Sequence, residues 1–215
     1  LGVFNYDIEK PISSAANSVV TLPLTGEISV DSVQACLNQT PEPTITFTGF
    51  DSDDNFPYTF EYTINDGAIN TIQPSDSSPS ASIAAPTTVV GEFTYTLISI
   101  TDSNDEEAEL DSEITITINS LPEVSVGVVS GNGECSGTPV VFSSTVSGDG
   151  PFSYAWEFGD GATSTNPNPS HTYNELGCGT TSYSVVLTVT DGNGCTTDVT
   201  ETVDILEEPD LDFFD

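Results

Sequence analysis

The chain has 215 residues with 34 Asp or Glu side chains and one basic side chain, Lys10, so its formal net charge is −33. A field of this sign repels phosphate backbones and anionic lipid, which excludes nucleic acid and membrane surfaces as partners. Hydrophobic residues make up 36% of the chain, and 17 Gly and 14 Pro favour short strands joined by turns. The sequence shows no transmembrane run or signal peptide, so we expect a mature fragment of a longer secreted protein, without membrane insertion.

Three segments of alternating apolar and polar residues resemble one another: GVFNYDI at 2–8, GEFTYTLISITD at 91–102 and TSYSVVLTVTD at 181–191. Their tyrosines, Tyr6, Tyr95 and Tyr183, lie 89 and 88 residues apart, which is the size of one immunoglobulin-like β-sandwich. We therefore predict an all-β fold of tandem immunoglobulin-like sandwiches in a linear array. The predicted parts are 1–26 (last hairpin of a preceding repeat), 27–119 and 120–207 (complete repeats) and 208–215 (linker into a following domain).

In the first complete repeat, the alternation predicts strands at 28–35, 43–49, 57–64, 69–73, 80–84, 92–101 and 109–118. Side chains alternate between the two faces of a strand, so aromatic residues at every second position are expected to face the opposite sheet. These inward residues are Tyr58, Phe60, Tyr62 and Ile64, then Phe93, Tyr95 and Leu97, and in the second repeat Phe152, Tyr154, Trp156 and Phe158, then Tyr183, Val185, Leu187 and Val189.

Two acidic loops of the first repeat, DSDDN at 51–55 and DSNDEE at 102–107, follow strands that end at the same edge of such a sandwich. Hard oxygen ligands in this number suit Ca²⁺, which takes 6–8 of them, although neither loop has the EF-hand pattern. The candidate calcium ligands are Asp51, Asp53, Asp54, Asp102, Asp105 and Glu106. The alternative is a pair of solvated acidic loops, and for Asp149 and Asp191, in the corresponding loops of the second repeat, turn formation is the favoured interpretation.

Four cysteines without CxxC spacing, and one histidine, argue against zinc and for disulfides in an extracellular compartment. Cys36 is expected at the far end of the first repeat, where it faces Cys195 at the near end of the second. We predict the pairs Cys36–Cys195, between the repeats, and Cys135–Cys178, within the second. The competing pair Cys135–Cys195 would have to span the length of a strand, about 17–20 Å.

The stretch YAWEFGDGATSTNPNPSHTY at 154–173 contains the chain's one tryptophan and one histidine. Ser170 and His171 are adjacent, so on a strand they face opposite ways and cannot act with Asp160 as a hydrolase triad. The combination of WEFGDG, NPNPSHTY and YSVVLTVTDGNG over about 123–205 resembles the PKD domain, an immunoglobulin-like sandwich of surface proteins. The resemblance implies a structural motif made of Trp156, Gly159, Asp160, Gly161, His171 and Tyr173.

The first complete repeat lacks this motif. Over about 40–118 its pattern ITFTGF, PYTFEYTINDGA and GEFTYTLISITD is similar to repeats of the giant gliding-motility adhesins of Bacteroidetes, the SprB type. That resemblance implies type IX secretion, an extracellular location on the cell surface in association with the outer membrane, and neighbouring repeats of the same polypeptide as partners. The first complete repeat differs from those adhesin repeats in one loop: it has the acidic segment 102–107 where they often carry a cysteine.

We therefore predict a non-enzymatic segment of a large adhesin that acts as a stiff stalk and contacts surface polysaccharide, with calcium as the one cofactor considered. The alternative is a spacer or carbohydrate-binding module of a secreted polysaccharide hydrolase or protease. Carbohydrate binding needs exposed aromatic residues, and the candidates outside the predicted core are Phe50, Phe56, Phe213 and Phe214.

Overall fold

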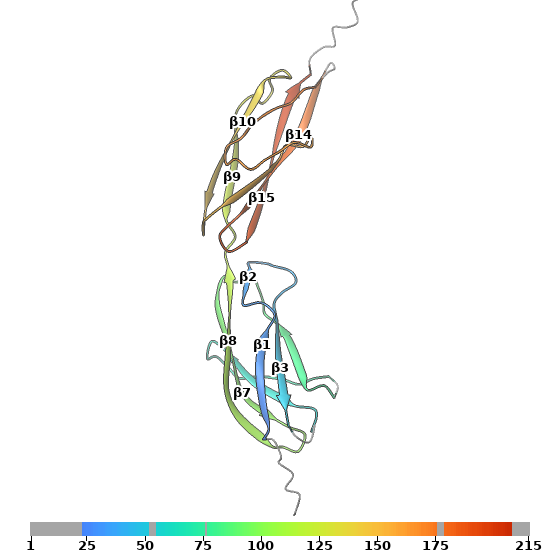
Figure 1. Cartoon of the computed structure of the whole chain (residues 1–215), viewed down its shortest axis with the longest axis vertical. Helices are drawn as coiled ribbons and strands as arrows, with labels where there is room; N and C mark the ends of the chain where they lie inside the picture. The colour runs from blue at the N-terminus through green and yellow to red at the C-terminus, as the bar shows by residue number, and fades with distance from the viewer. Residues whose placement is uncertain (1–22, 52–54, 76, 176–178, 208–215) are drawn as a thin grey trace, which may run out of the picture.

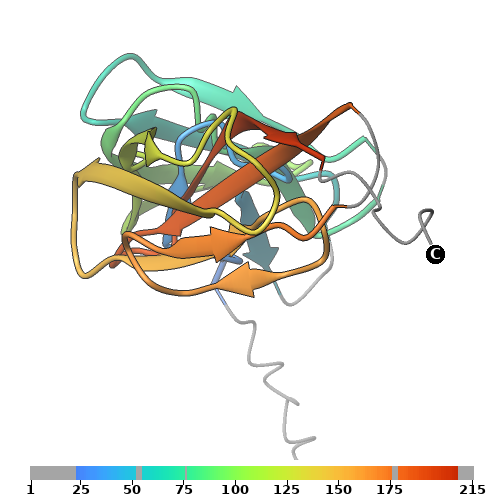
Figure 2. The ribbon, with the colours of Figure 1, turned by 90° about the horizontal axis from the view of Figure 1, so that it is seen from above.

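The computed structural model describes residues 23–51, 55–75, 77–175 and 179–207. Within these ranges the chain forms two β-sandwiches that lie end to end along the long axis of the molecule (Figure 1), and the view from above shows one sandwich stacked over the other (Figure 2). The part of the chain that the structure describes contains no helix that is long and apolar enough to cross a membrane.

The first sandwich consists of a three-stranded sheet in the order β1-β3-β6 and a five-stranded sheet in the order β2-β8-β7-β4-β5. Its strands are β1 (Thr25–Val30), β2 (Gln34–Cys36), β3 (Thr44–Phe50), β4 (Thr59–Ile64), β5 (Asn70–Ile72), β6 (Ser80–Ala84), β7 (Gly91–Thr101) and β8 (Glu107–Asn119). The pairs are antiparallel except β2 with β8, where Cys36 lies opposite Asn119 in a parallel ladder.

The second sandwich repeats this arrangement with the sheets β13-β10-β9 and β12-β11-β14-β15. Its strands are β9 (Glu123–Ser130), β10 (Pro139–Ser147), β11 (Ser153–Glu157), β12 (Thr163–Ser164), β13 (Ser170–Thr172), β14 (Thr180–Thr190) and β15 (Thr196–Leu206). Apart from β2, which has only an isolated bridge from Cys135 to Leu206 as its counterpart, the two sandwiches have the same strand order, which confirms the predicted fold class of tandem immunoglobulin-like β-sandwiches.

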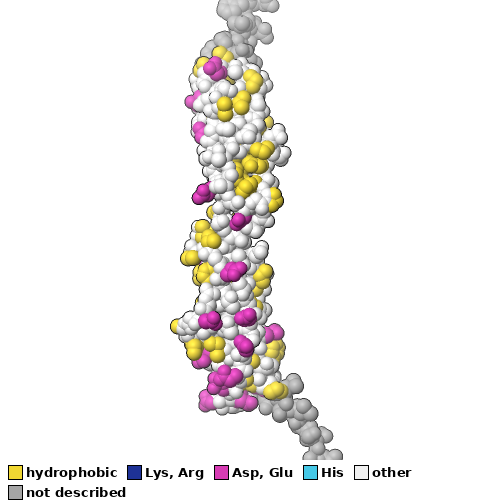
Figure 3. Space-filling model, turned by 90° about the vertical axis from the view of Figure 1, so that its left-hand side faces the viewer, with side chains coloured by type: hydrophobic (Ala, Val, Ile, Leu, Met, Phe, Trp, Pro, Cys, Tyr) yellow, Lys and Arg dark blue, Asp and Glu magenta, His cyan; other side chains and the backbone are white. Residues whose placement is uncertain are grey.

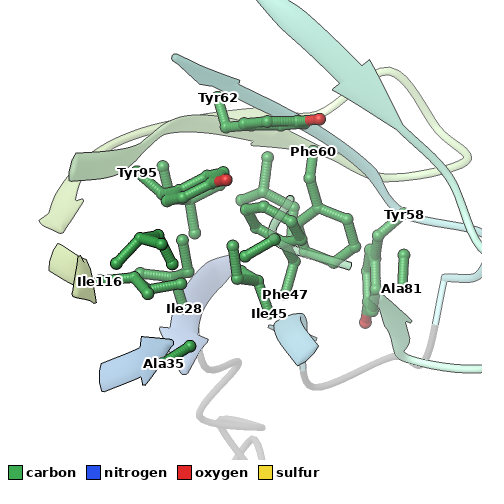
Figure 4. Packing of buried hydrophobic residues seen from close by; sticks show 14 of the residues in the cluster. Ile28, Ala35, Ile45, Phe47, Tyr58, Phe60, Tyr62, Ala81, Tyr95 and Ile116 are labelled. Atoms are coloured by element: carbon green, nitrogen blue, oxygen red, sulfur yellow. The ribbon is translucent and has the colours of Figure 1, made fainter. Parts of the chain in front are cut away.

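Each sandwich has its own core between its two sheets. In the first, aromatic side chains from β3, β4 and β7 pack against aliphatic ones from β1 and β8; Figure 4 shows Phe47, Phe60, Tyr62 and Tyr95 in this packing. In the second, Trp156 and Phe158 pack on Phe142 of the facing sheet, with ring centroids 5.4 and 5.5 Å apart. Burial of these large side chains stabilises each sandwich by roughly 25 cal/mol per Å² of apolar surface.

Two predicted boundaries differ from the structure. The predicted strand 28–35 is two strands, because the chain passes from one sheet to the other at Asp31–Val33: β1 pairs with β3, and β2 pairs with β8. The first sandwich also starts before residue 27, since Leu24 is only 7% exposed in its core and β1 begins at Thr25. Most of the predicted hairpin 1–26 and all of the predicted linker 208–215 lie outside the described residues.

Candidate functional site

The two sandwiches meet at a joint with two covalent connections. The first is the short segment Ser120–Pro122 between the end of β8 and the start of β9, in which Pro122 is buried and Leu121 half-buried. The second is a disulfide between Cys36 and Cys195, with a Cα–Cα distance of 5.5 Å and a sequence separation of 159. Because Cys36 lies beside Asn119 in the β2–β8 ladder, both connections leave the first sandwich from adjacent strands.

A tight turn between β14 and β15 positions Cys195 at this joint. The turn begins at Asp191, whose side chain is 6% exposed and whose Oδ1 accepts the backbone N–H groups of Asn193 and Cys195, both at 2.9 Å. The Cys195 carbonyl in turn accepts the N–H of Asp191 at 2.9 Å, and Gly194 has a φ of 85°, which favours glycine. Asp191 is therefore a turn former, as predicted, and it fixes the cysteine that makes the bridge.

The second sandwich also holds the connecting segment by a polar contact. The Thr197 hydroxyl, in β15, donates to the Pro122 carbonyl at 2.7 Å. Beside this contact lies a groove of about 450 Å³ between the loop 36–40 of the first sandwich, Leu121, and Gly194 and Thr196 of the second. The joint thus combines a covalent bridge, a short link and a hydrogen bond, and each limits rotation of one sandwich against the other.

The tryptophan motif lies in the second sandwich as a packing unit. Trp156 is 1% exposed and its indole Nε1 donates to the Asn166 carbonyl at 2.9 Å. Gly159 and Gly161, with φ of 86° and 93°, form the turn in which Asp160 Oδ1 accepts the Ala162 N–H at 2.9 Å. Asp160 is therefore a turn residue.

The imidazole of His171 completes this packing. Its Nε2 lies 2.7 Å from Asp160 Oδ2, and its ring stacks on Phe158 with centroids 4.3 Å apart. Partial burial raises the pKa of Asp160, but the Ala162 N–H and the His171 ring outweigh this and hold the pKa below its usual value. Since Nε2 faces the carboxylate and one ring face is covered by Phe158, His171 has a structural role in this arrangement.

Tyr173 and Tyr183 lie next to this unit and were not singled out together from the sequence. Their rings stack with centroids 4.2 Å apart; the Tyr173 hydroxyl donates to the Phe158 carbonyl at 3.0 Å, and the Tyr183 hydroxyl donates to Glu175. Burial first, and the hydrogen bond to Glu175 second, raise the pKa of Tyr183 to about 12, and burial also raises the pKa of Tyr173. Both phenols are thus held in the neutral form.

The acidic loops at the other end of the first sandwich do meet, as predicted: the Ser103 N–H donates to the Asn55 carbonyl at 3.2 Å. Figure 3 shows acidic side chains gathered at this lower end of the molecule. Asp102, however, is 5% exposed and its Oδ1 accepts the N–H groups of Asn104 and Glu106, at 2.8 and 2.9 Å, so this carboxylate forms the turn.

For the same loops, the described ranges contain no group of three or more His, Cys, Asp or Glu side chains placed to hold a metal ion. Two of the six predicted ligands, Asp53 and Asp54, lie outside those ranges. Calcium binding stays a prediction, with Asp51, Asp105 and Glu106 as the remaining described candidates.

The other predicted disulfide, Cys135–Cys178, also stays a prediction. Cys135 is exposed and has no sulfur partner among the described residues, and Cys178 lies outside them. The competing pair Cys135–Cys195 does not form in this structure, because Cys195 is bonded to Cys36.

An apolar groove of about 420 Å³ opens beside β3 and the 55–58 segment, with Phe50, Phe56 and Tyr58 among its lining residues. Phe50 is 47% exposed, whereas Phe56 packs edge-on against Tyr58 and belongs to the margin of the core. Of the aromatic residues predicted as glycan contacts, Phe50 therefore lies open to solvent, while Phe213 and Phe214 lie outside the described residues.

Two in-line immunoglobulin-like sandwiches with a cross-linked joint define a modular β-sandwich protein. Within it, residues 119–206, the whole second sandwich, match the family model of the PKD domain. This match confirms the resemblance of the WEFGDG motif and its flanking strands to that domain.

The chain is also similar to parts of known proteins. It is 55% identical over 42 residues to collagenase ColA of Bacillus cereus (20% of this chain, 4% of that protein) and 44% identical over 70 residues to a microbial collagenase of Vibrio alginolyticus (31% and 8%). The chain thus spans less than a tenth of the length of these curated relatives. Among solved structures, the PKD1 domain of Vibrio anguillarum Epp is 33% identical, with a TM-score of 0.35, over 42% of this chain and 99% of that one.

Proposed function

We propose that this chain is a non-enzymatic repeat segment of a large secreted adhesin, in which it acts as a stiff stalk on the cell surface. The observation that carries the proposal is the joint, where two neighbouring connections, a disulfide and a three-residue segment, hold the two sandwiches end to end. Two attachments oppose bending in most directions, whereas a single flexible link leaves neighbouring domains free to reorient. A disulfide also fits an oxidising compartment outside the cytosol.

The chemistry of the surface supports a stalk. The described residues contain neither Lys nor Arg, and Asp160–His171 is the one ion pair found within them. A surface with one sign of charge keeps extended copies apart and soluble. The gliding-motility setting, type IX secretion and contact with surface polysaccharide belong to this proposal through the similarity of residues 40–118 to repeats of the SprB type.

A second function is favoured by the matches to two collagenases: a spacer or carbohydrate-binding module within a secreted hydrolase or protease. The exposed Phe50 beside the apolar groove is the feature that would contact a sugar ring in that case.

Immunolabelling of the producing cells with an antibody against this chain tests the proposal. We expect the label to stay bound to intact cells and to extend outward from their surface. We also expect cells to attach less strongly to a solid surface under flow when the parent protein carries Cys36→Ser and Cys195→Ser. Antigen found wholly in the medium, on a polypeptide with hydrolase or protease activity, would overturn the adhesin assignment in favour of the spacer. A Phe50→Ala variant of the isolated chain, tested on a glycan array against the wild type, measures whether the groove binds sugar.

A further inference from the structure

We propose that Cys135, in place of the predicted pair with Cys178, forms a second bridge between sandwiches: a disulfide with a cysteine in the β14–β15-type turn of a β-sandwich that follows residue 207. The proposal rests on the proposed stalk function only in requiring a following sandwich. Its evidence is the internal repetition of the structure, because the residue equivalent to Cys135 is already bonded in this way.

Cys36 and Cys135 occupy the same position in their sandwiches. After Cys36, the N–H groups of Leu37, Asn38 and Gln39 donate to the carbonyls of Asn119, Thr87 and Cys36, each at 2.9 Å. After Cys135, the N–H groups of Ser136, Gly137 and Thr138 donate to the carbonyls of Leu206, Tyr173 and Cys135, at 2.8, 2.9 and 3.1 Å.

The backbone conformation and the strand pairing agree with this equivalence. The third residue of each turn has a positive φ, 60° at Asn38 and 84° at Gly137. Each cysteine also pairs in parallel with the end of the last strand of its sandwich, Cys36 with Asn119 and Cys135 with Leu206. The two sulfur atoms therefore start from the same place relative to the point where the chain leaves each sandwich.

The sequence after each of these points is also similar. Asn119 is followed by SLPEVSVGVV, and Leu206 by EEPDLDFFD. Pro209 corresponds to Pro122, and both prolines are followed by an acidic residue and then by apolar residues at alternate positions: Val124 and Val126 in one, Leu211 and Phe213 in the other. The sequence after Leu206 thus has the same pattern as the segment through which the chain leaves the first sandwich.

Cys195, which is bonded across a joint, and Cys135, which has no sulfur partner among the described residues, differ in exposure. Cys195 is fully buried against its partner at the joint, whereas Cys135 is exposed at the opposite end of the second sandwich, beside the exit of the chain. A following sandwich placed as the second is placed on the first would cover Cys135 and bring the turn before its last strand to this sulfur. That turn must carry a cysteine four residues after an aspartate, as Asp191 and Cys195 do.

The bond forms by oxidation of two thiols, in which the two sulfur atoms lose two protons and two electrons to an oxidant. The electron acceptor is of the disulfide or quinone class that oxidises secreted proteins, and it also serves the Cys36–Cys195 pair. No other change in covalent structure is required.

The test is a longer chain, residues 1–206 followed directly by a second copy of residues 120–215. After oxidation, alkylation without reductant and digestion with chymotrypsin, cleavage at Tyr95, Phe142, Tyr173, Tyr183, Leu187 and Leu206 separates the cysteines into different peptides. We expect the peptide of the first Cys135 to be linked to that of the second copy's Cys195. A Cys195→Ser change in the second copy alone is the matched control, and it must return the first Cys135 to full alkylation.

Two results would overturn the proposal: a peptide that links Cys135 to Cys178, or a first Cys135 that is alkylated as completely as in the single chain. A second measurement keeps the test independent of folding of the tandem. In the parent protein, alkylated as isolated from the producing cells, Cys135 must resist alkylation and be linked to a peptide from outside residues 1–215. Because neither experiment measures adhesion, a failure here leaves the stalk function to its own test.

Discussion

The disulfide at the joint predicts how the molecule responds to tension between its ends. The covalent path from residue 23 to residue 207 runs through the Cys36–Cys195 bond, so the sequence separation of 159 between these cysteines is closed into a loop that force does not enter. Only residues 23–36 and 195–207 can then extend, which is roughly 90 Å of chain at 3.3–3.6 Å per residue.

Removing the bridge releases the loop. With Cys36→Ser and Cys195→Ser, we expect the contour length gained on unfolding to increase by roughly 540 Å. Single-molecule force spectroscopy, with handles at the two ends of the chain, measures this length for the wild type and the double variant. Cys135→Ser is the matched control and should leave the wild-type length unchanged.

The same measurement reports on the second pair of cysteines. If Cys135 and Cys178 were bonded, the gain in the double variant would fall short by roughly 145 Å, because a second loop would stay closed. A wild-type chain that already extends to the length of the double variant, under non-reducing conditions, would refute the assigned bridge and the reasoning built on it.

Three further predictions concern stability and binding. Trp156→Ala should lower the free energy of unfolding of the second sandwich by about 3–5 kcal/mol, and Trp156→Phe by less, as measured by urea denaturation followed by circular dichroism. Glu157→Gln, at an exposed neighbouring position, is the control and should change this free energy by under about 0.5 kcal/mol; a loss equal to that of Trp156→Ala would contradict the core role of Trp156. Folding raises the pKa of Tyr183 from near 10 to about 12, so the contribution of its neutral phenol to the free energy of unfolding is complete below pH 10 and is lost as the pH rises from 10 to 12. The free energy of unfolding should therefore fall across this window, and fall less in Tyr183→Phe; a wild-type value that does not change with pH would contradict this prediction. If calcium binds the acidic loops, a hundredfold excess over Kd should stabilise the chain by about 2.7 kcal/mol relative to the same chain with chelator. Asp105→Asn should reduce this gain without straining the backbone, because asparagine also accepts the positive φ of this position; identical melting with calcium and with chelator would remove the calcium prediction.

The strand faces could be predicted from sequence because each face is decided locally. Phe60 lies between Thr59 and Glu61, and Tyr95 lies between two threonines, so burial of these aromatic side chains follows from strand geometry alone. The sheet change at Asp31–Val33 could not be predicted in this way, because the alternation continues while the pairing partner changes from β3 to β8.

At the joint, the cysteine pair could be predicted from the sequence, whereas the roles of the turn-forming aspartates could not. The facing ends of two stacked sandwiches led to Cys36 and Cys195, since strand order fixes the end at which each cysteine lies. The roles of Asp102 and Asp191 depend on hydrogen bonds to backbone N–H groups within five residues, and an acidic run gives no sign of which carboxylate turns inward. The spacing of Asp191 and Cys195 in DGNGC, matched by Asp102 and Glu106 in DSNDE, was the available signal.

That matched pair of turns makes the two ends of the first sandwich unequal. The Asp102 N–H donates to the Glu106 carbonyl at 3.0 Å just as the Asp191 N–H donates to that of Cys195, so Glu106 occupies the position of the bridging cysteine. A carboxylate cannot form a disulfide, so this turn offers no cross-link to a neighbouring sandwich. The first sandwich therefore carries a bridging cysteine, Cys36, at its carboxyl-terminal end and a carboxylate, Glu106, at the equivalent turn of its other end, so the described residues supply a cross-link at one end alone.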